Sequence, residues 1–269
     1  MADPAPTPSR SRLRLLAAAI AGLLPLIPVA IGLSLGGGTT PATATTAASA
    51  SHFAVVGSTP KPSRPGLTLP GGSGALVALI AHRTALRAQP GGRVVARLPP
   101  RTPFGSPQAV WVRRVSGHWL GVVTVLAGNN RLGWIPAADA SLSRVGWELR
   151  VSLAQRRLTV LDRGRPVQHF AIAVGAPASP TPTGRFAVTD RLSTGDPAGP
   201  YGCCILALSA LAPHAIQGWT GGNRIAIHST PETSSIGEPV SHGCMRLTLA
   251  EGRWLLEHIP LGTPTVISS

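Results

Sequence analysis

Few residues of this sequence are charged or aromatic, and almost none is lysine. Charged residues make up 13% of the 269 positions and aromatic residues 4%, and Lys61 is the only lysine. The formal net charge of +14 therefore comes almost entirely from arginine. The arginines are scattered, with no dense run and no aromatic residues between them, which argues against a nucleic-acid-binding protein. Two interpretations of the charge remain: arginine bias from a GC-rich genome on a solvated surface, or retention on an anionic polymer of the cell envelope.

The N-terminal segment carries the features of an export signal. Arg10, Arg12 and Arg14 precede an apolar run at residues 15–35 that contains no charged residue. About 20 apolar residues can span a bilayer core, and positive charges before them favour an orientation that sends the rest of the chain out. Residues 1–38 are therefore predicted to be an uncleaved signal anchor in the membrane or a removed signal peptide. In both cases we expect the body of the protein in the cell envelope, outside the cytoplasm.

Two further segments precede the C-terminal half. Residues 39–74 are rich in Pro, Thr, Ala and Gly and have little to bury, which predicts a flexible linker. Residues 75–142 contain short apolar runs separated by turn residues, which predicts a small all-β module. The predicted strands lie at 75–80, 94–98, 110–112, 119–125 and 132–135.

The end of this module resembles a known small fold. The segment from His118 to Val123 and the segment Gly133-Trp134-Ile135, joined by a Gly-Asn-Asn turn, resemble the last hairpin of a bacterial Src-homology-three-like β-barrel. In that family such modules often bind or position cell-wall material, although a spacer without a ligand fits the sequence as well. We expect Trp119 and Trp134 in the core rather than on a binding face.

From residue 147 to the end, the pattern again predicts strands. Apolar residues alternate with polar ones at 149–153 and 170–174, as in strands with one buried face. Thr248 and Glu251 have the spacing of a capping box, which predicts a helix that ends before Pro260. A closing strand is predicted at 263–267, so about 120 residues would form one core of modest stability.

The chain has three cysteines, so at least one stays unpaired within a single molecule. For the adjacent Cys203 and Cys204, a buried pair in a strand and a vicinal disulfide both remain open. Cys244 stands alone, and a free thiol outside the cytoplasm is prone to oxidation. Its retention suggests a function, of which nucleophilic catalysis is the commonest.

A catalytic Cys244 needs a base nearby, because cysteine is a good nucleophile only as the thiolate. Two histidines qualify: His242, two residues before the cysteine, and His228 at the end of an alternating strand. Gly243 permits a tight turn in which backbone N–H groups converge, as in an oxyanion hole. We expect His228 to be the base, and the Gly243 and Cys244 amides, beside His242, to be the oxyanion donors. A metal site formed by these histidines and Cys244 would lack a fourth ligand.

Four segments, in this order, resemble the signature of L,D-transpeptidase catalytic domains. They are Thr-Pro-Thr-Gly-Arg-Phe at 181–186, Ile-His-Ser at 227–229, Ile-Gly-Glu-Pro-Val-Ser-His-Gly-Cys-Met-Arg-Leu at 236–247, and Leu-Gly-Thr-Pro at 261–264. The resemblance covers residues 147–269 and implies a mainly β, β-sandwich-like catalytic domain with short helices.

The resemblance also implies roles for single residues. Cys244 would be acylated, and His228 would accept its proton. The backbone carbonyl of Ser229, where many members of the family have Gly, would orient the imidazole. Further candidates for shaping the site or binding substrate are Arg246, Tyr201 and, as part of a lid, Trp219.

The implied reaction is a two-step acyl transfer on peptidoglycan stem peptides, which serve as donor and acceptor. Cys244 would attack the carbonyl of the L-centre of the diamino acid at the third stem position and expel the terminal D-alanine, leaving a thioester. Capture by a side-chain amine of a neighbouring stem would give a 3→3 crosslink. The resemblance implies no metal or organic cofactor, and it implies inhibition by carbapenems.

Other functions remain open at this point. Capture of the thioester by water would make the enzyme an L,D-carboxypeptidase. Another cysteine hydrolase of the wall is a rival, although the common ones place the cysteine before the histidine, the reverse of the order here. A catalytically inactive domain kept for wall binding is the third alternative. The sequence does not indicate the oligomeric state.

Overall fold

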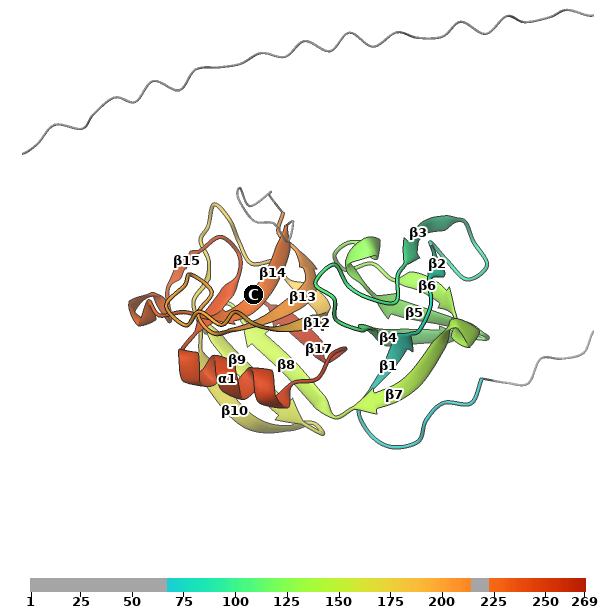
Figure 1. Cartoon of the computed structure of the whole chain (residues 1–269), viewed down its shortest axis with the longest axis horizontal. Helices are drawn as coiled ribbons and strands as arrows, with labels where there is room; N and C mark the ends of the chain where they lie inside the picture. The colour runs from blue at the N-terminus through green and yellow to red at the C-terminus, as the bar shows by residue number, and fades with distance from the viewer. Residues whose placement is uncertain (1–66, 214–222) are drawn as a thin grey trace, which may run out of the picture. The chain divides into compact units, whose positions relative to one another are not determined.

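The computed structural model describes residues 67–213 and 223–269 (Figure 1). Within them it contains seventeen strands, three short 3-10 helices and one α-helix, which confirms the predicted mainly β fold class. The predicted signal anchor or signal peptide of residues 1–38 lies outside the described residues. No helix of the described part is long and apolar enough to cross a membrane.

The first sheet has seven strands in the order β3-β2-β6-β5-β4-β1-β7. Its strands are β1 (Ala75–Ile80), β2 (Thr84–Arg87), β3 (Val94–Leu98), β4 (Gln108–Ser116), β5 (Trp119–Val123), β6 (Gly133–Pro136) and β7 (Ala140–Val145), with the 3-10 helices η1 (Val125–Ala127) and η2 (Ala137–Asp139). Its core is a cluster of fully buried aliphatic residues that includes Leu86, Val110, Leu120 and Ile135. Trp134 is 8% exposed and belongs to the core as expected, whereas Trp119 is only half-buried.

The five predicted strands of this module correspond to β1, β3, β4, β5 and β6. The pattern missed β2, which is only four residues long, and β7, which pairs with β1 along its whole length and extends to Val145. The module's sheet therefore ends beyond the predicted boundary at residue 142. Its resemblance to a Src-homology-three-like barrel stays a prediction.

The second sheet has eight strands in the order β10-β9-β8-β17-β12-β13-β14-β16. Its strands are β8 (Trp147–Ser152), β9 (Arg157–Asp162), β10 (Arg165–Ala171), β12 (Gly184–Ser193), β13 (Cys204–Leu211), β14 (Arg224–Ser229), β16 (Met245–Leu247) and β17 (Pro264–Ser268). Two short strands, β11 (Val174–Gly175) and β15 (Pro239–Ser241), pair in parallel beside it, and a 3-10 helix η3 (Thr233–Ser235) precedes β15.

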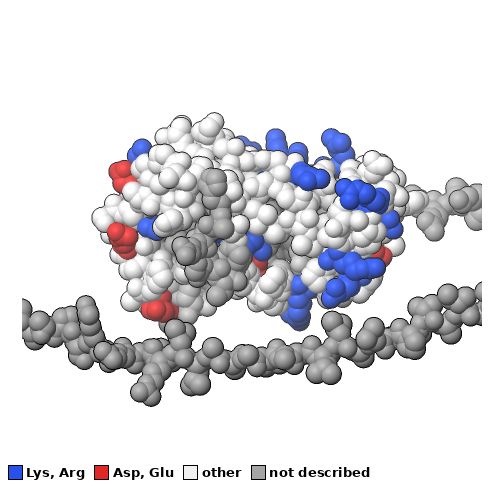
Figure 2. Space-filling view, turned by 90° about the horizontal axis from the view of Figure 1, so that it is seen from above, with Lys and Arg blue, Asp and Glu red and all other residues white. Residues whose placement is uncertain are grey.

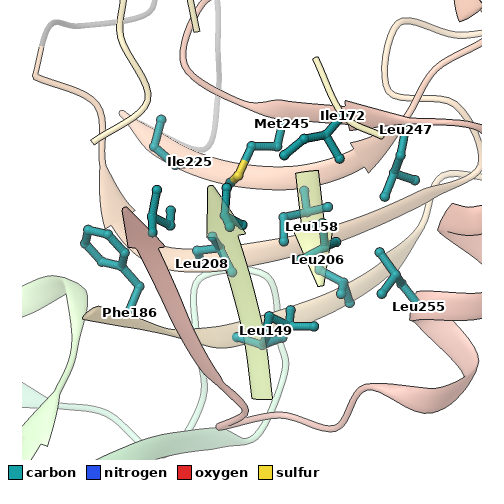
Figure 3. Packing of buried hydrophobic residues seen from close by; sticks show 14 of the residues in the cluster. Leu149, Leu158, Ile172, Phe186, Leu206, Leu208, Ile225, Met245, Leu247 and Leu255 are labelled. Atoms are coloured by element: carbon teal, nitrogen blue, oxygen red, sulfur yellow. The ribbon is translucent and has the colours of Figure 1, made fainter. Parts of the chain in front are cut away.

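The core of the second sheet consists mainly of strand residues, and Leu255 of the helix α1 (Leu249–His258) packs against them. Figure 3 shows Phe186, Leu206 and Leu208 from the central strands facing Met245 and Leu149, and Leu255 of α1 closing one side. Thr248 and Glu251 form the predicted capping box, because the Thr248 hydroxyl accepts from the Glu251 amide and the Glu251 carboxylate accepts from the Thr248 amide. This cap fixes where α1 begins, directly after β16.

Candidate active site

The parallel pairing of β14 with β16 brings His228 close to Cys244. Ile227 pairs with Met245 and His228 with Arg246, and Cys244 directly precedes Met245. The side chains of His228 and Cys244 line one cavity of about 200 Å³, together with Pro200, Tyr201, Ser241, His242 and Arg246. The two residues that the sequence singled out as nucleophile and base thus share one cavity, although sixteen positions separate them in the chain.

His228 is held in one orientation by its neighbour in the chain. Its Nδ1 lies 2.8 Å from the carbonyl oxygen of Ser229, and only a protonated Nδ1 can donate to that oxygen. The remaining nitrogen, Nε2, is then the unprotonated acceptor of the neutral ring. This is the contact that the resemblance implied for the Ser229 carbonyl.

Burial keeps this imidazole neutral. His228 is 3% exposed. Desolvation lowers its pKa to about 4; the hydrogen bond to Ser229 opposes this shift, and the charge of Arg246 adds to it. At neutral pH the ring is therefore uncharged and able to take up a proton.

The pKa of Cys244 is shifted in the opposite direction to that of His228, and this shift also favours the uncharged form. Burial raises the pKa of its thiol above the ordinary value, while a hydrogen bond with the Ala226 backbone and the charge of Arg246 lower it in part. The sequence predicts a cysteine that reacts as the thiolate. In the free protein both shifts favour a neutral thiol beside a neutral imidazole, so the thiolate has to form during the reaction.

The turn that carries Cys244 is fixed by hydrogen bonds from two side chains. Thr181, from the Thr-Pro-Thr-Gly segment, donates to the Gly243 carbonyl at 2.8 Å and accepts from the Gly175 amide at 2.9 Å. The Ser241 hydroxyl donates to the Cys244 carbonyl at 2.6 Å. Gly243 has φ of 111°, and a Cβ there would lie 2.9 Å from Ile225, so the turn requires glycine.

The Gly243 amide, one of the two predicted oxyanion donors, has a partner within the turn. It donates to the Ser241 hydroxyl with an N to O distance of 3.1 Å. Its participation in an oxyanion hole would require sharing or breaking that bond. His242 is exposed and lines the cavity, so its side chain can contact a ligand there. The oxyanion roles of these residues stay predictions.

Tyr201 and Arg246 form two walls of the cavity. The Tyr201 ring packs edge-on against His228, with ring centroids 5.0 Å apart. Burial and the neighbouring Cys244 raise the pKa of Tyr201, so it stays a neutral phenol. Arg246 Nη1 lies 3.6 Å from a carboxylate oxygen of Glu232, and its buried Nε has no hydrogen-bond partner in the described part of the chain. Trp219, the third predicted substrate-binding residue, lies outside the described residues.

The hydroxyl of Ser229 joins the site to the adjacent cysteines, a contact that sequence reasoning missed. Cys203 and Cys204 are bonded to each other in a vicinal disulfide, and both are buried, with Cys204 at the start of β13. The Ser229 Oγ accepts from the Cys204 amide at 3.1 Å and lies 3.4 Å from Cys203 Sγ. A Cβ on Gly202 or Gly252 would lie within 2.8 Å of Ser229 atoms. The only sequence signal is the serine itself, at a position where the family often has glycine.

Comparisons with known proteins agree on the identity of the C-terminal region. The YkuD family, described as the L,D-transpeptidase catalytic domain, matches residues 147–267. YkuD of Bacillus licheniformis, whose name assigns it to the L,D-transpeptidases, is 33% identical over 124 residues, which is 46% of this chain and 67% of that protein. YkuD of Bacillus subtilis is 31% identical over the same shares of both chains.

Solved structures give weaker likenesses. L,D-transpeptidase 3 from Mycobacterium tuberculosis is 19% identical with a TM-score of 0.37, over 51% of this chain and 74% of that chain. The same enzyme with a faropenem-derived adduct is 20% identical with a TM-score of 0.37, over 51% and 73% of the two chains. Because these scores are low, family membership rests on the sequence matches.

Proposed function

We propose that this chain, which belongs to the YkuD family of L,D-transpeptidases, crosslinks peptidoglycan through a thioester on Cys244. The observation that carries the proposal is the 2.8 Å contact between His228 Nδ1 and the Ser229 carbonyl. It fixes the ring so that Nε2 is the acceptor, in the cavity that His228 shares with Cys244. The low pKa of His228, about 4, supplies that acceptor at neutral pH.

In the first step, His228 Nε2 takes the proton from Cys244 while the sulfur attacks the carbonyl of the L-centre at the third stem position. The C–S bond forms and the carbonyl oxygen becomes an oxyanion. When this adduct collapses, the imidazolium gives its proton to the departing nitrogen of the terminal D-alanine. The product is a thioester on Cys244 and free D-alanine. Proton transfer by a positioned histidine contributes about 10²- to 10⁴-fold to such a step.

In the second step, a side-chain amine of a neighbouring stem attacks the thioester. His228 accepts a proton from the amine, the C–S bond breaks, and the Cys244 thiolate recovers its proton. The new amide is a 3→3 crosslink, and the enzyme returns to its neutral resting pair. Water in place of the amine would release a tripeptide, which is the L,D-carboxypeptidase alternative.

Arg246 gives the cavity a positive charge suited to this substrate. Stem peptides end in a carboxylate, and a guanidinium pairs with carboxylates through charge-assisted hydrogen bonds. Arg246 lines the cavity, so its guanidinium group can meet that carboxylate there. Tyr201, packed on His228, would cover the other side of the donor peptide.

A single incubation separates the candidate functions. The full chain would be mixed with disaccharide-tetrapeptide, and the masses of the products would be determined by mass spectrometry. Crosslinked dimer with free D-alanine is expected. Tripeptide without dimer would establish the carboxypeptidase, and no turnover would indicate an inactive wall-binding domain. The Cys244→Ala variant should be inactive, and turnover in that variant would refute the assigned nucleophile.

The proposal includes the arrangement of the chain and its compartment. Residues 147–269 would be the catalytic domain, residues 75–142 a small barrel, residues 39–74 a linker, and residues 1–38 the export signal that places the enzyme in the cell envelope. Carbapenems would acylate Cys244 as stem peptides do, because their strained amide is an electrophile for the same sulfur. A mass increase of one carbapenem per chain, absent from Cys244→Ala, would test this.

A further inference from the structure

Positive charge is distributed unevenly along the chain. Residues 75–142 contain eight arginines and a single acidic residue, Asp139, whereas residues 147–269 contain ten arginines and eight acidic residues. On the face shown in Figure 2, the basic side chains gather mainly over the end formed by the β1–β7 sheet, and most acidic side chains lie at the other end. The small module therefore carries most of the uncompensated charge of the described part.

Ion pairs neutralise arginines only in the catalytic region. In the part of the chain that the structure describes, the arginines within 4 Å of a carboxylate are Arg150, Arg156, Arg163, Arg224 and Arg246. Asp139, the acidic residue of the module, contacts Thr84 and His82 instead. With Asp139 as its one acidic residue, the module cannot pair its eight arginines internally, so their charge stays available to an anionic ligand.

Three unpaired arginines of the small module line one groove. Arg93, Arg114 and Arg131 lie around a hollow of about 510 Å³ between the β2–β3 hairpin and the segment from η1 to β6. All three are exposed, and no described residue forms a hydrogen bond or ion pair with their guanidinium groups.

The same groove has apolar contact surface. Val95 and Leu126 line it and are 39% and 46% exposed, and the buried Trp134 lines it as well. A ligand that fits must therefore bring negative charges at intervals and apolar stretches between them. A concave lining suits a chain better than a flat bilayer surface.

We propose that this groove binds a linear polymer whose backbone contains phosphodiester groups separated by short polyol units. In such a polymer the negative charges lie in the chain itself, so they can enter the groove. There the planar guanidinium groups can donate paired hydrogen bonds to the phosphate oxygens. The CH₂ groups between them would contact Val95 and Leu126. Carboxylates on a polyuronate lie at the ring periphery and would reach the groove less well. This binding is independent of the chemistry at Cys244.

The test compares two triple variants with the same loss of charge. The groove variant is Arg93→Ser, Arg114→Ser and Arg131→Ser. The control variant is Arg157→Ser, Arg165→Ser and Arg253→Ser, three exposed arginines of the catalytic region. Binding of the full chain to synthetic poly(glycerol phosphate) would be measured over a range of salt concentrations. Polygalacturonate and phosphatidylglycerol vesicles serve as competing ligands.

We expect the groove variant to bind at least about tenfold more weakly, and the slope of log affinity against log salt to fall by about 2, at about 0.7 per lost contact. The control variant should bind within about twofold of the wild type. Equal weakening in both variants would show diffuse charge instead of a site. Preference for polygalacturonate or vesicles, or no binding by the wild type, would also overturn the proposal. If the triple variant unfolds, the single variant Arg131→Gln should still lower the salt slope.

Discussion

The hydroxyl of Ser229 accepts a hydrogen bond from the amide of Cys204 at 3.1 Å, while the carbonyl of the same serine receives His228 Nδ1. One residue thus ties the proposed base to the strand β13 and to the vicinal disulfide at its start. The hydroxyl and the carbonyl have separable functions, because only the carbonyl touches the imidazole. The hydroxyl is a packing and hydrogen-bonding group inside a fully buried position.

Ser229→Ala should therefore lower stability more than activity. The variant leaves the buried Cys204 amide without its acceptor, which costs about 1–3 kcal/mol. The carbonyl stays, so kcat should remain within about tenfold of the wild type. Chemical unfolding and turnover of disaccharide-tetrapeptide would measure the two effects. A folded variant with no activity would mean that the hydroxyl itself acts in the reaction.

The state of the three cysteines gives a second prediction. Because Cys203 and Cys204 are bonded to each other, alkylation of the unreduced protein in denaturant should modify one thiol per chain, at Cys244. After reduction, three thiols should react. Mass spectrometry of the alkylated peptide that contains residues 203 and 204 would settle the point. Three reactive thiols without reduction would rule out the vicinal disulfide.

The sequence predicted the half-buried strand β8 and left β13, which is buried on both faces, without bounds. The alternation around Leu149 and Val151 was sufficient to place β8. β13, with seven of eight residues buried, gives a continuous apolar run without alternation, which periodicity alone does not assign. The capping box of α1 was predictable because both of its partners lie within four residues.

The distance along the chain between contacting residues explains what was predictable at the site. The pairing of His228 with Cys244 followed from local motifs and a family resemblance. The contacts of Ser229 with residues 202, 204 and 252 join segments more than twenty positions apart, so no local pattern encodes them. The bond from the Gly243 amide to Ser241 is local, but it depends on a side-chain rotamer that sequence does not specify.

The buried imidazole gives a third prediction, on pH. The pKa of His228 falls from 6.5 to about 4 on folding, so the unfolded chain binds the proton first as the pH drops. The stability that the neutral ring contributes is present above about pH 6.5 and is lost as the pH falls toward 4. Chemical unfolding between pH 7 and pH 4 should show this loss, and His228→Gln should remove that part of it.

Acylation of Cys244 should follow the same titration. Above pH 5 the ring is unprotonated and the rate of carbapenem acylation should be level, and below about pH 4 it should fall tenfold per pH unit, since a protonated His228 accepts nothing. Stopped-flow measurement of carbapenem consumption would give the profile. A rate that instead rises with pH around 6.5 would indicate a solvent-exposed imidazole and contradict the described burial. His228→Gln should slow acylation by about 10²- to 10⁴-fold.

A buried ion pair supplies the last prediction. Asp190 is fully buried in β12, and one of its oxygens lies 3.5 Å from Nη2 of Arg224, the first residue of β14. Thr102, from the small module, donates a hydrogen bond to the other carboxylate oxygen. Removing one partner of such a pair leaves an uncompensated charge inside the protein. Asp190→Ala should therefore lower the free energy of unfolding by about 3–5 kcal/mol.

Thr102→Val is the control that keeps the ion pair. It removes the hydrogen bond to Asp190 and also the acceptor of the Phe104 and Ser106 amides. Its cost should be about 1–3 kcal/mol, below that of Asp190→Ala. Since β14 begins at Arg224 and ends at His228 and Ser229, the Asp190→Ala protein that remains folded should also turn over substrate more slowly. Equal costs for the two variants would mean that the charge of Arg224 is satisfied elsewhere, by its bonds to the Leu208 carbonyl and the Thr189 hydroxyl. In that case the position of β14, and with it that of the imidazole, would not depend on Asp190.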